Sequence, residues 1–485
     1  MAAVTSTSAS LRMLVERLNH PIRQTRWRTA REIAVLLQSV EHRGEAAKVY
    51  LDWLRARSFE SEVATGLTVL LCRGAADALD ADDVAAAISR PSALSQMLMR
   101  FAFGDDAPDV AWSKCHSGSS PATFEAGRYF HDNKGAQVPP VLDTSITRLE
   151  RRLRMPLSRQ WAFEWHQLMQ SSGAEHSRFP YHYVDGSMAR NGVLAQVSQR
   201  QCDAYRSAFL RTLSCAVDEW GAPEDFMLQV SLDTLPASRG LLDLDPSEKP
   251  PWLLEDWQGA ANGESLEGAA RRVLAQHRKS GRQRLASLRA PVSVATTPFG
   301  HVSLRAVLAT ADFVAPDDGL VKADRSLFWV LPDMVTIEGR VGRGSVDDYI
   351  QMGRVGSCMP LCLDLVPFPC GFWHSDYFHV GISIPAPYVC KGAVDIACAT
   401  NRLSVVSAGR SAGSWSFWHD HWSPQYHSDG MTRVGCVSEI ADDELNWAMA
   451  KFGMRLAWVV DMQYWTRRTD YGEFDKVERR EFFFG

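Results

Sequence analysis

Hydrophobic side chains change their spacing once along this chain, close to Pro291. Before that point they recur three and four residues apart, as in Ser198–Trp220, where Gly221 and Pro223 supply the usual stop signals of a helix. After it they alternate with polar residues, as in 292–295, which is the pattern of a strand with one buried face. This switch predicts an α+β protein in which most helices precede the strands.

The length of 485 residues suggests about three domains, at roughly 150 residues each. We expect a helical domain over residues 11–103 and a mostly helical domain over 143–290. A linker over 104–142, rich in Gly, Ser and Pro, would join them. Residues 291–485 then form a strand-rich α+β domain with one helix over Asp442–Phe452, so the predicted fold class is α+β and multidomain.

The composition is that of an ordinary globular protein, with 46% hydrophobic and 22% charged residues. It excludes a disordered, collagen-like or coiled-coil chain. The formal net charge of −5 also excludes a nucleic-acid binder that is basic along its whole length. No signal peptide and no apolar run of membrane-spanning length are visible. The ten Cys include no CxxC pair, so we expect a cytoplasmic protein with reduced thiols and no membrane partner.

One segment near the N-terminus, His20–Ala34, reads HPIRQTRWRTAREIA. Its Pro, followed by Arg and small Ala residues where two helices would pack, resembles the inner part of a HEAT-type repeat. The resemblance covers roughly the first fifth of the chain, where two helix pairs follow the pattern. A self-standing solenoid needs at least about three repeats, so this region would be a cap that leans on the next domain. The resemblance implies a protein-binding surface and names no partner.

Tryptophan is concentrated near the C-terminus, where six of the sixteen lie between Trp415 and Trp465. Large amphipathic rings are enriched in interface centres as well as in cores. We predict a partner-binding aromatic surface formed by Trp415, Trp418 and Trp422. If the change Trp418→Ala unfolds the domain instead of loosening a complex, the cluster belongs to the core.

The same stretch contains candidate metal ligands, His419, His421, His427 and Asp429. On a strand His419 and His421 share a face, and two such imidazoles can bind one divalent metal. A third ligand from His427 or Asp429 would leave a position for an activated water, as in a hydrolase or nuclease. The cofactor would then be zinc or another divalent metal. The alternative is that these imidazoles line the polar edge of a packed aromatic cluster and that there is no cofactor.

A second metal hypothesis concerns a group of Cys and His residues between Cys358 and Cys398. Its members are Cys358, Cys362, Cys370, His374, His379, Cys390 and Cys398. Their spacing is compatible with a structural zinc site. The interval is apolar and rich in Pro, which favours buried thiols instead.

A basic stripe lies in a region without Asp or Glu, residues 268–311. A helix is predicted over 264–288, with Gly281 as a candidate break. The stripe begins with Arg271, Arg272, Arg278, Lys279, Arg282 and Arg284, and continues with Arg289 and Arg305. It could contact phosphates of a nucleic acid, or it could be the solvated face of a helix.

No motif has both the spacing and the context of an enzyme site. Residues 409–413 match G-x-S-x-G, but the following residues do not read as the helix that a nucleophile elbow requires. We therefore favour a non-enzymatic cytoplasmic adaptor that binds a protein partner. By analogy alone, it would be a component of a bacterial effector or antiviral defence assembly. The alternatives are a metal-dependent hydrolase or nuclease, and a nucleic-acid-contacting subunit.

Overall fold

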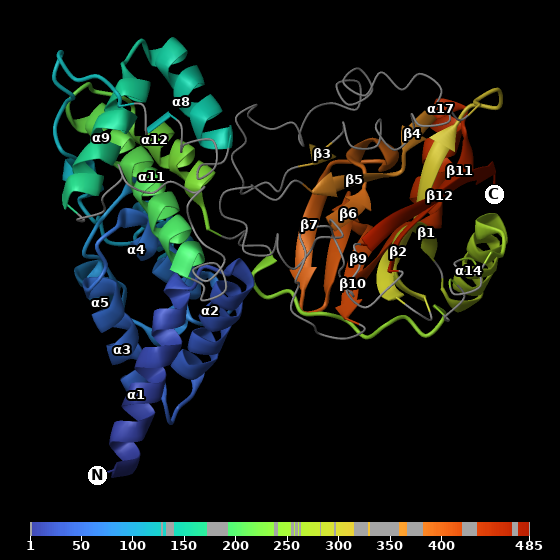
Figure 1. Ribbon diagram of the computed structural model, residues 1–485, viewed down its shortest axis with the longest axis horizontal. Coiled ribbons are helices and arrows are strands. Elements are labelled where there is room, and N and C mark those ends of the chain that lie inside the picture. Colours follow the sequence, from blue (N-terminus) through green and yellow to red (C-terminus); the bar gives the residue numbers. More distant parts are fainter. Residues whose placement is uncertain are drawn as a thin grey trace. The chain divides into compact units, whose positions relative to one another are not determined.

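The structure is a computed structural model (Figure 1). It describes residues 2–127, 130–131, 140–171, 193–236, 241–253, 257, 260, 263–281, 283–294, 297–314, 328–329, 358–365, 382–419, 434–467 and 474–484. These residues form two compact units, unit 1 up to Leu242 and unit 2 from Asp243. The predicted fold class is confirmed, because helices fill the first part of the chain and a strand-rich sheet with a helix fills the last part.

Unit 1 consists of helices in the described residues (Figure 1). Its α-helices are α1 (Ala2–Glu16), α2 (Arg23–Gln38), α3 (Arg43–Arg55), α4 (Glu60–Leu67), α5 (Ala81–Ala87), α6 (Ala93–Phe103), α8 (Pro140–Leu153), α9 (Leu157–Ser171), α11 (Val193–Asp218) and α12 (Glu224–Ser231). Short 3₁₀ turns include η4 (Trp112–Lys114) and η6 (Leu232–Thr234). The helix predicted up to Trp220 is α11, and Gly221 beyond it has the left-handed φ of 66° that favours glycine after a helix.

The hydrophobic spacing read from the sequence explains how these helices pack. On α2 the side chains of Trp27, Ile33 and Leu37 are buried, and they lie on one helical face. The Trp27 indole also donates a hydrogen bond to the carbonyl oxygen of Leu242, at 2.8 Å. The helices of the HEAT-like segment are therefore present, while their membership of that repeat family stays a prediction.

The segment predicted as a linker, 104–142, is in part folded onto unit 1. The Ser117 backbone N–H donates to Glu164 of α9 at 2.8 Å, and the Ser120 N–H donates to Gln160 of α9 at the same distance. The last residues of the predicted linker belong to α8. The observed division into two units therefore differs from the predicted domains, since 11–103 and 143–242 share unit 1. The Gly, Ser and Pro content indicated irregular backbone, which polar side chains of α9 hold in place.

Unit 2 is built on a nine-stranded sheet in which every pair is antiparallel. The order along the sheet is β12-β11-β2-β1-β10-β9-β8-β7, with β4 beside the end of β2. The strands are β1 (Gln283–Val294), β2 (Thr297–Ala309), β4 (Cys358–Pro360), β7 (Val394–Ala399), β8 (Arg402–Ser407), β9 (Arg410–His419), β10 (Val434–Ala441), β11 (Arg455–Arg467) and β12 (Phe474–Phe484). A small sheet contains β3 (Phe328–Trp329), β5 (Cys362–Leu365) and β6 (Ile382–Pro385).

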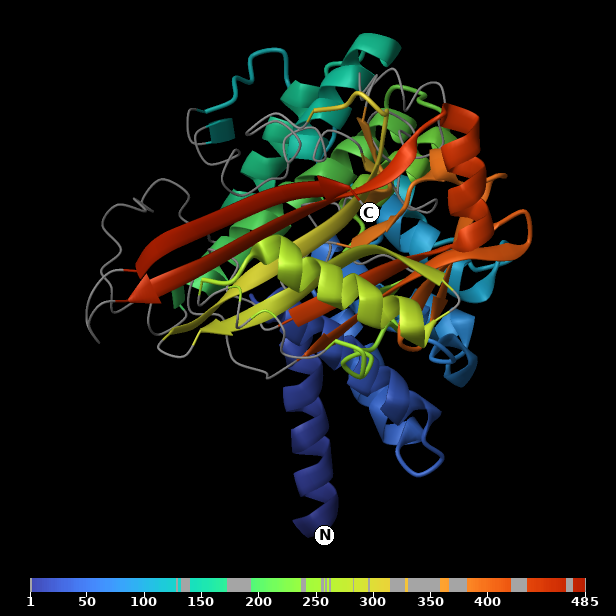
Figure 2. The ribbon, with the colours of Figure 1, turned by 90° about the vertical axis from the view of Figure 1, so that its right-hand side faces the viewer.

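Two elements cover opposite faces of the large sheet. Helix α14 (Leu266–Ser280) lies along one face (Figure 2), where its His277 bonds to Glu439 of β10 at 2.8 Å. The neighbouring residue Ser438 donates to the carbonyl oxygen of Ser383 in β6. Because consecutive side chains of a strand point to opposite faces, β6 covers the other face. Helix α17 (Asp442–Phe452) joins β10 to β11, as the sequence predicted.

The predicted helix over 264–288 is wrong in its last third. Helix α14 ends at Ser280, and β1 begins at Gln283. Gly281 is therefore a boundary between a helix and a strand. The strand was missed because Leu285 and Leu288 also fit a helical spacing, and pairing with β10 and β2 decides between the two. No helix in the described parts of the chain is long and apolar enough to cross a membrane.

Candidate functional site

The predicted partner surface lies in the interior of unit 2. Trp415 and Trp418 are both 0% exposed in β9. Trp415 lies opposite Ser438 and hence on the β6 face, where it stacks on Phe417 with ring centroids 5.5 Å apart. The prediction that these two rings form a docking surface is therefore wrong, because a buried ring offers a partner nothing to contact. Trp422 is outside the described residues.

A glycine explains how Trp418 is accommodated. Trp418 pairs with Gly435 of β10 in the register of the sheet. A Cβ atom at Gly435 would overlap the Trp418 ring, so the indole lies directly over the bare backbone of β10. A glycine within a strand often marks such a place, where another group approaches the backbone closely.

Only one of the four predicted metal ligands lies in the described residues. The backbone of His419 ends β9, while His421, His427 and Asp429 are outside the described residues. In the Cys/His group, Cys358 and Cys390 are buried, and burial raises the pKa of the Cys390 thiol to about 12. Cys362 lies in β5 and Cys398 in β7. Cys370, His374 and His379 are outside the described residues.

The basic stripe is divided among α14, β1 and β2, and four of its eight members pair with carboxylates. On α14, Arg271 bonds to Glu267 at 2.7 Å and Arg272 to Glu264 at 3.1 Å. Further along, Arg284 of β1 bonds to Asp442 at 2.5 Å. These contacts favour ion pairs within unit 2 over contacts with phosphate.

The remaining members of the stripe lie apart from those pairs. Arg278 and Lys279 are exposed in the last turn of α14, where basic side chains complement the helix dipole. On the sheet, Arg289 bonds to His301 at 2.9 Å, and Arg305 bonds to Asp461 at 3.3 Å. Arg282 is outside the described residues.

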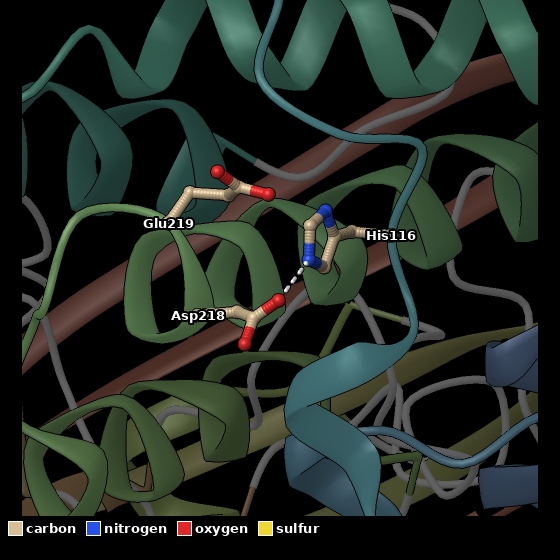
Figure 3. A group of neighbouring side chains, drawn as sticks. All are labelled: His116, Asp218 and Glu219. Atoms are coloured by element: carbon tan, nitrogen blue, oxygen red, sulfur yellow. Dashed lines mark hydrogen bonds and ion pairs between the residues drawn. The ribbon is translucent and has the colours of Figure 1, made fainter.

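Among the described residues, one group could hold a metal ion, namely the cluster of His116, Asp218 and Glu219 (Figure 3). Its ligand atoms all lie within 4.8 Å of one another. His116 follows η4, Asp218 ends α11 and Glu219 comes directly after it, so residues about a hundred positions apart meet here. Figure 3 shows the imidazole and the Asp218 carboxylate pointing toward one another.

The hydrogen bonds of this cluster determine which ring nitrogen of His116 carries the proton. The Gly118 N–H donates to Nδ1 at 3.0 Å, so Nδ1 carries no proton. Nε2 of the neutral ring must then carry it and donate to Asp218 Oδ2, at 3.1 Å. The other carboxylate oxygen accepts from Lys114 Nζ at 2.5 Å. The hydrogen bond from Lys114 lowers the pKa of Asp218 the most, and the hydrogen bond from His116 lowers it further.

This geometry supports an intramolecular ion-pair site more than a metal centre. A metal bound at His116 Nε2 would have to remove the proton there and displace the Lys114 ammonium from Asp218. The ammonium already supplies a cation to the acidic end of α11, where the helix dipole is negative. Sequence reasoning overlooked the cluster, although one signal was present. Two acidic residues end a predicted helix at a position where basic residues are expected.

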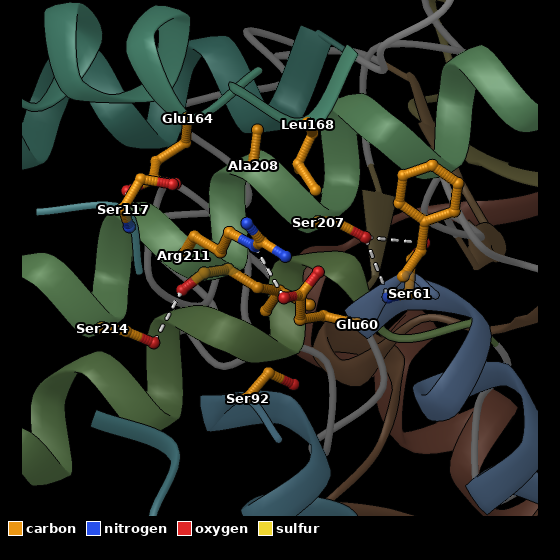
Figure 4. A network of polar contacts seen from close by, with 12 residues as sticks. Glu60, Ser61, Ser92, Ser117, Glu164, Leu168, Ser207, Ala208, Arg211 and Ser214 are labelled. Carbon is orange, nitrogen blue, oxygen red and sulfur yellow. Dashed lines mark hydrogen bonds and ion pairs between the residues drawn. The ribbon is translucent and has the colours of Figure 1, made fainter. Parts of the chain in front are cut away.

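Buried polar contacts join α4 to α11 within unit 1 (Figure 4). Arg211 Nε donates to Glu60 Oε1 at 2.6 Å, and only 2% of the Glu60 side chain is exposed. One turn earlier, the Ser61 N–H donates to Ser207 Oγ at 3.0 Å, and Ser61 Oγ donates to Asp203. Burial raises the pKa of Glu60, and the Arg211 charge opposes that rise. The network fixes the first turn of α4 against α11 and exposes no reactive group.

Another buried carboxyl lies where η6 meets α8. Asp233 is 2% exposed, and burial raises its pKa to about 7. A hydrogen bond from Ser145 and the charge of Arg148 act in the opposite direction. This carboxyl therefore changes charge near neutral pH, inside a contact between helices.

Exposed hydrophobic side chains are concentrated on the first two helices. Five large hydrophobic side chains are exposed in the described residues, and four of them lie between residues 13 and 40. They are Met13 on α1, Ile22 at the start of α2, Val35 on α2, and Val40 just after it. The fifth is Val314 in unit 2. We call the first four residues the N-terminal apolar set.

The comparisons with known proteins add no family to this description. No protein-family model matches the chain, and no curated protein matches it. The function is therefore inferred from the residues and contacts described above.

Proposed function

We propose that this protein is a non-enzymatic cytoplasmic adaptor that binds a protein partner through α1 and α2. The observation that carries the proposal is the N-terminal apolar set, four exposed hydrophobic side chains within 28 consecutive positions. Single exposed hydrophobic residues are normal on a soluble protein, but a concentration of them in one region is typical of an interaction site. The HEAT-like segment 20–34 lies within the same stretch, and that resemblance implies a protein-binding surface.

The surroundings of Val35 support the same proposal. On α2 the exposed residues Arg28 and Glu32 lie seven and three positions before Val35, so all three fall on one helical face. An aliphatic side chain next to charged ones is the usual composition of an interface with a polar rim. Burying a Val side chain in a complex contributes about 1.5–3 kcal/mol, which is roughly tenfold or more in affinity.

The observed contacts favour this proposal over nucleic-acid binding. A phosphate would have to compete with Glu267, Glu264 and Asp442 for the arginines of the stripe. Metal-dependent hydrolysis stays a prediction, since three of its four ligands lie outside the described residues.

The test compares proteins that copurify with the chain from its native host. We expect the double variant Val35→Glu, Val40→Glu to lose its partner, because each carboxylate would have to be desolvated in the interface. The control is Val314→Glu, which places the same charge at a comparably exposed site in unit 2 and should keep the partner. Circular dichroism must show that all variants stay folded. Equal recovery of every copurifying protein with the double variant would overturn the proposal.

A further inference from the structure

The sheet of unit 2 ends on two very different strands. In the described residues its edges are β12 and β7. Six of the eleven residues of β12 are charged, namely Asp475, Lys476, Glu478, Arg479, Arg480 and Glu481. Of the six residues of β7 only Asp395 is charged. Charged residues on an edge hinder pairing with another chain, so β12 is protected in this way and β7 is not.

Strand β12 is also tied to the region around the start of α14. Arg479 donates to the carbonyl oxygens of Ala260 and Glu264, and Glu481 accepts the Glu267 N–H at 2.5 Å. On β7, by contrast, the side chains of Asp395, Ala397 and Ala399 are exposed, and none of them is large. Another strand could therefore approach β7 without steric hindrance from these side chains.

The hairpin between β7 and β8 defines which backbone groups of β7 point outward. Ala399 pairs with Arg402 across the two residues 400–401. The pair that closes a two-residue loop exchanges hydrogen bonds, and such pairs alternate along the ladder. Ala399, Ala397 and Asp395 therefore bond inward to β8, while the N–H and C=O groups of Val394 and Ile396 point away from it. Directly after β7, the Thr400 carbonyl accepts the Asp245 N–H at 2.5 Å. The part of the edge that is open to another strand therefore ends before Thr400.

We propose that β7 pairs antiparallel with β7 of a second copy of this chain, about a twofold axis at Ala397, and so forms a dimer. In this register Asp395 lies opposite Ala399 of the second copy, which keeps the two carboxylates apart. The small exposed side chains provide neither the charge nor the pockets by which an edge selects a foreign peptide. A twofold contact uses the same strand on both copies, so every favourable pair occurs twice.

Charge complementation at position 397 tests the pairing directly. In Ala397→Lys two ammonium groups would lie opposite each other, and we expect dimerisation at least about fivefold weaker than in the wild type. Ala397→Glu should weaken it similarly, and an equimolar mixture of the two variants should restore a heterodimer. Sedimentation velocity over a range of concentrations measures all three. The matched control is Ala399→Lys, which places the charge opposite Asp395 and should leave the dimer intact.

Crosslinking tests the register. In a Cys398→Ser background, Ala397→Cys should form an intermolecular disulfide under mild oxidation, because a pair without mutual hydrogen bonds brings Cα atoms to about 4.5 Å. Ala399→Cys in the same background should not. A wild-type chain that stays monomeric, a dimer that is indifferent to the change Ala397→Lys, or crosslinking at position 399 alone would each overturn the proposal. Binding of a foreign extended peptide to monomeric chain at β7 would overturn it as well.

This inference does not depend on the proposed adaptor function. The β7 variants alter unit 2, whereas the partner surface is proposed on α1 and α2. A loss of dimerisation with unchanged copurification, or the reverse, therefore separates the two proposals.

Discussion

In unit 1 a buried ion pair joins α4 to α11, whereas in unit 2 a buried tryptophan ring of β9 lies over a glycine of β10. Glu60 and Arg211 form an ion pair in the first case. Trp418 lies over Gly435 in the second. Both contacts are buried, but they respond differently to substitution. A buried charge depends on its partner, while a buried ring depends on the space around it.

The largest effect is expected in unit 2. Replacing Trp418 by Ala should lower the free energy of unfolding by about 3–5 kcal/mol, because a large cavity would remain over Gly435. Urea unfolding followed by circular dichroism measures this change. Trp447→Ala on α17 is the control, since that ring is only half-buried and should cost less. A variant as stable as the wild type would show that the ring does not support the core.

In unit 1, Arg211→Met should lower the free energy of unfolding by about 3 kcal/mol or more at pH 7, because Glu60 would stay buried without its cation. The raised pKa of Glu60 fixes the sign of the pH dependence. The protonated acid is tolerated in the interior, so the deficit should shrink as the pH falls. The double variant Glu60→Leu, Arg211→Met should recover most of the loss, because no unpaired charge remains. If the double variant is no more stable than Arg211→Met, the loss of stability does not come from an unpaired charge on Glu60.

A smaller effect is expected from Asp233. Its folded pKa of about 7 lies above the ordinary value of 3.8, so stability falls as the pH rises from about 4 to 7. Asp233→Asn cannot ionise, and should therefore be more stable than the wild type at pH 8 by about 2–4 kcal/mol. The two chains should converge near pH 4. Parallel urea titrations across this range measure the difference, and a constant gap at all pH values would contradict it.

Local patterns predicted much of the fold because they depend on near neighbours. The spacing around α11 and α17 is visible within a few turns of helix, and both helices were found close to their predicted positions. The segment after Gly281 was misassigned because Leu285 and Leu288 lie three positions apart, which is a helical spacing. Strands β9 and β10 were missed, since nearly every side chain in them is buried and a strand that is buried on both faces lacks the polar alternation that identifies a strand.

The candidate sites were much harder to predict. Nothing near His116 in the sequence indicates Asp218, which lies 102 positions away. Likewise, the high Trp content of β9 indicated burial somewhere but not whether a partner or the chain itself provides it. Gly435 answers that question, and its role becomes visible only when β10 is paired with β9 in register.

The sequence by itself determined the order of helices and strands, the switch near Pro291, and the ordinary globular composition, because each of these follows from residues close together in the chain. The tertiary structure alone decided which rings are interior, which arginines are paired with carboxylates, and which edge of the sheet carries few charges. Those properties depend on contacts between residues far apart in the chain, and a local pattern contains no information about what packs against it.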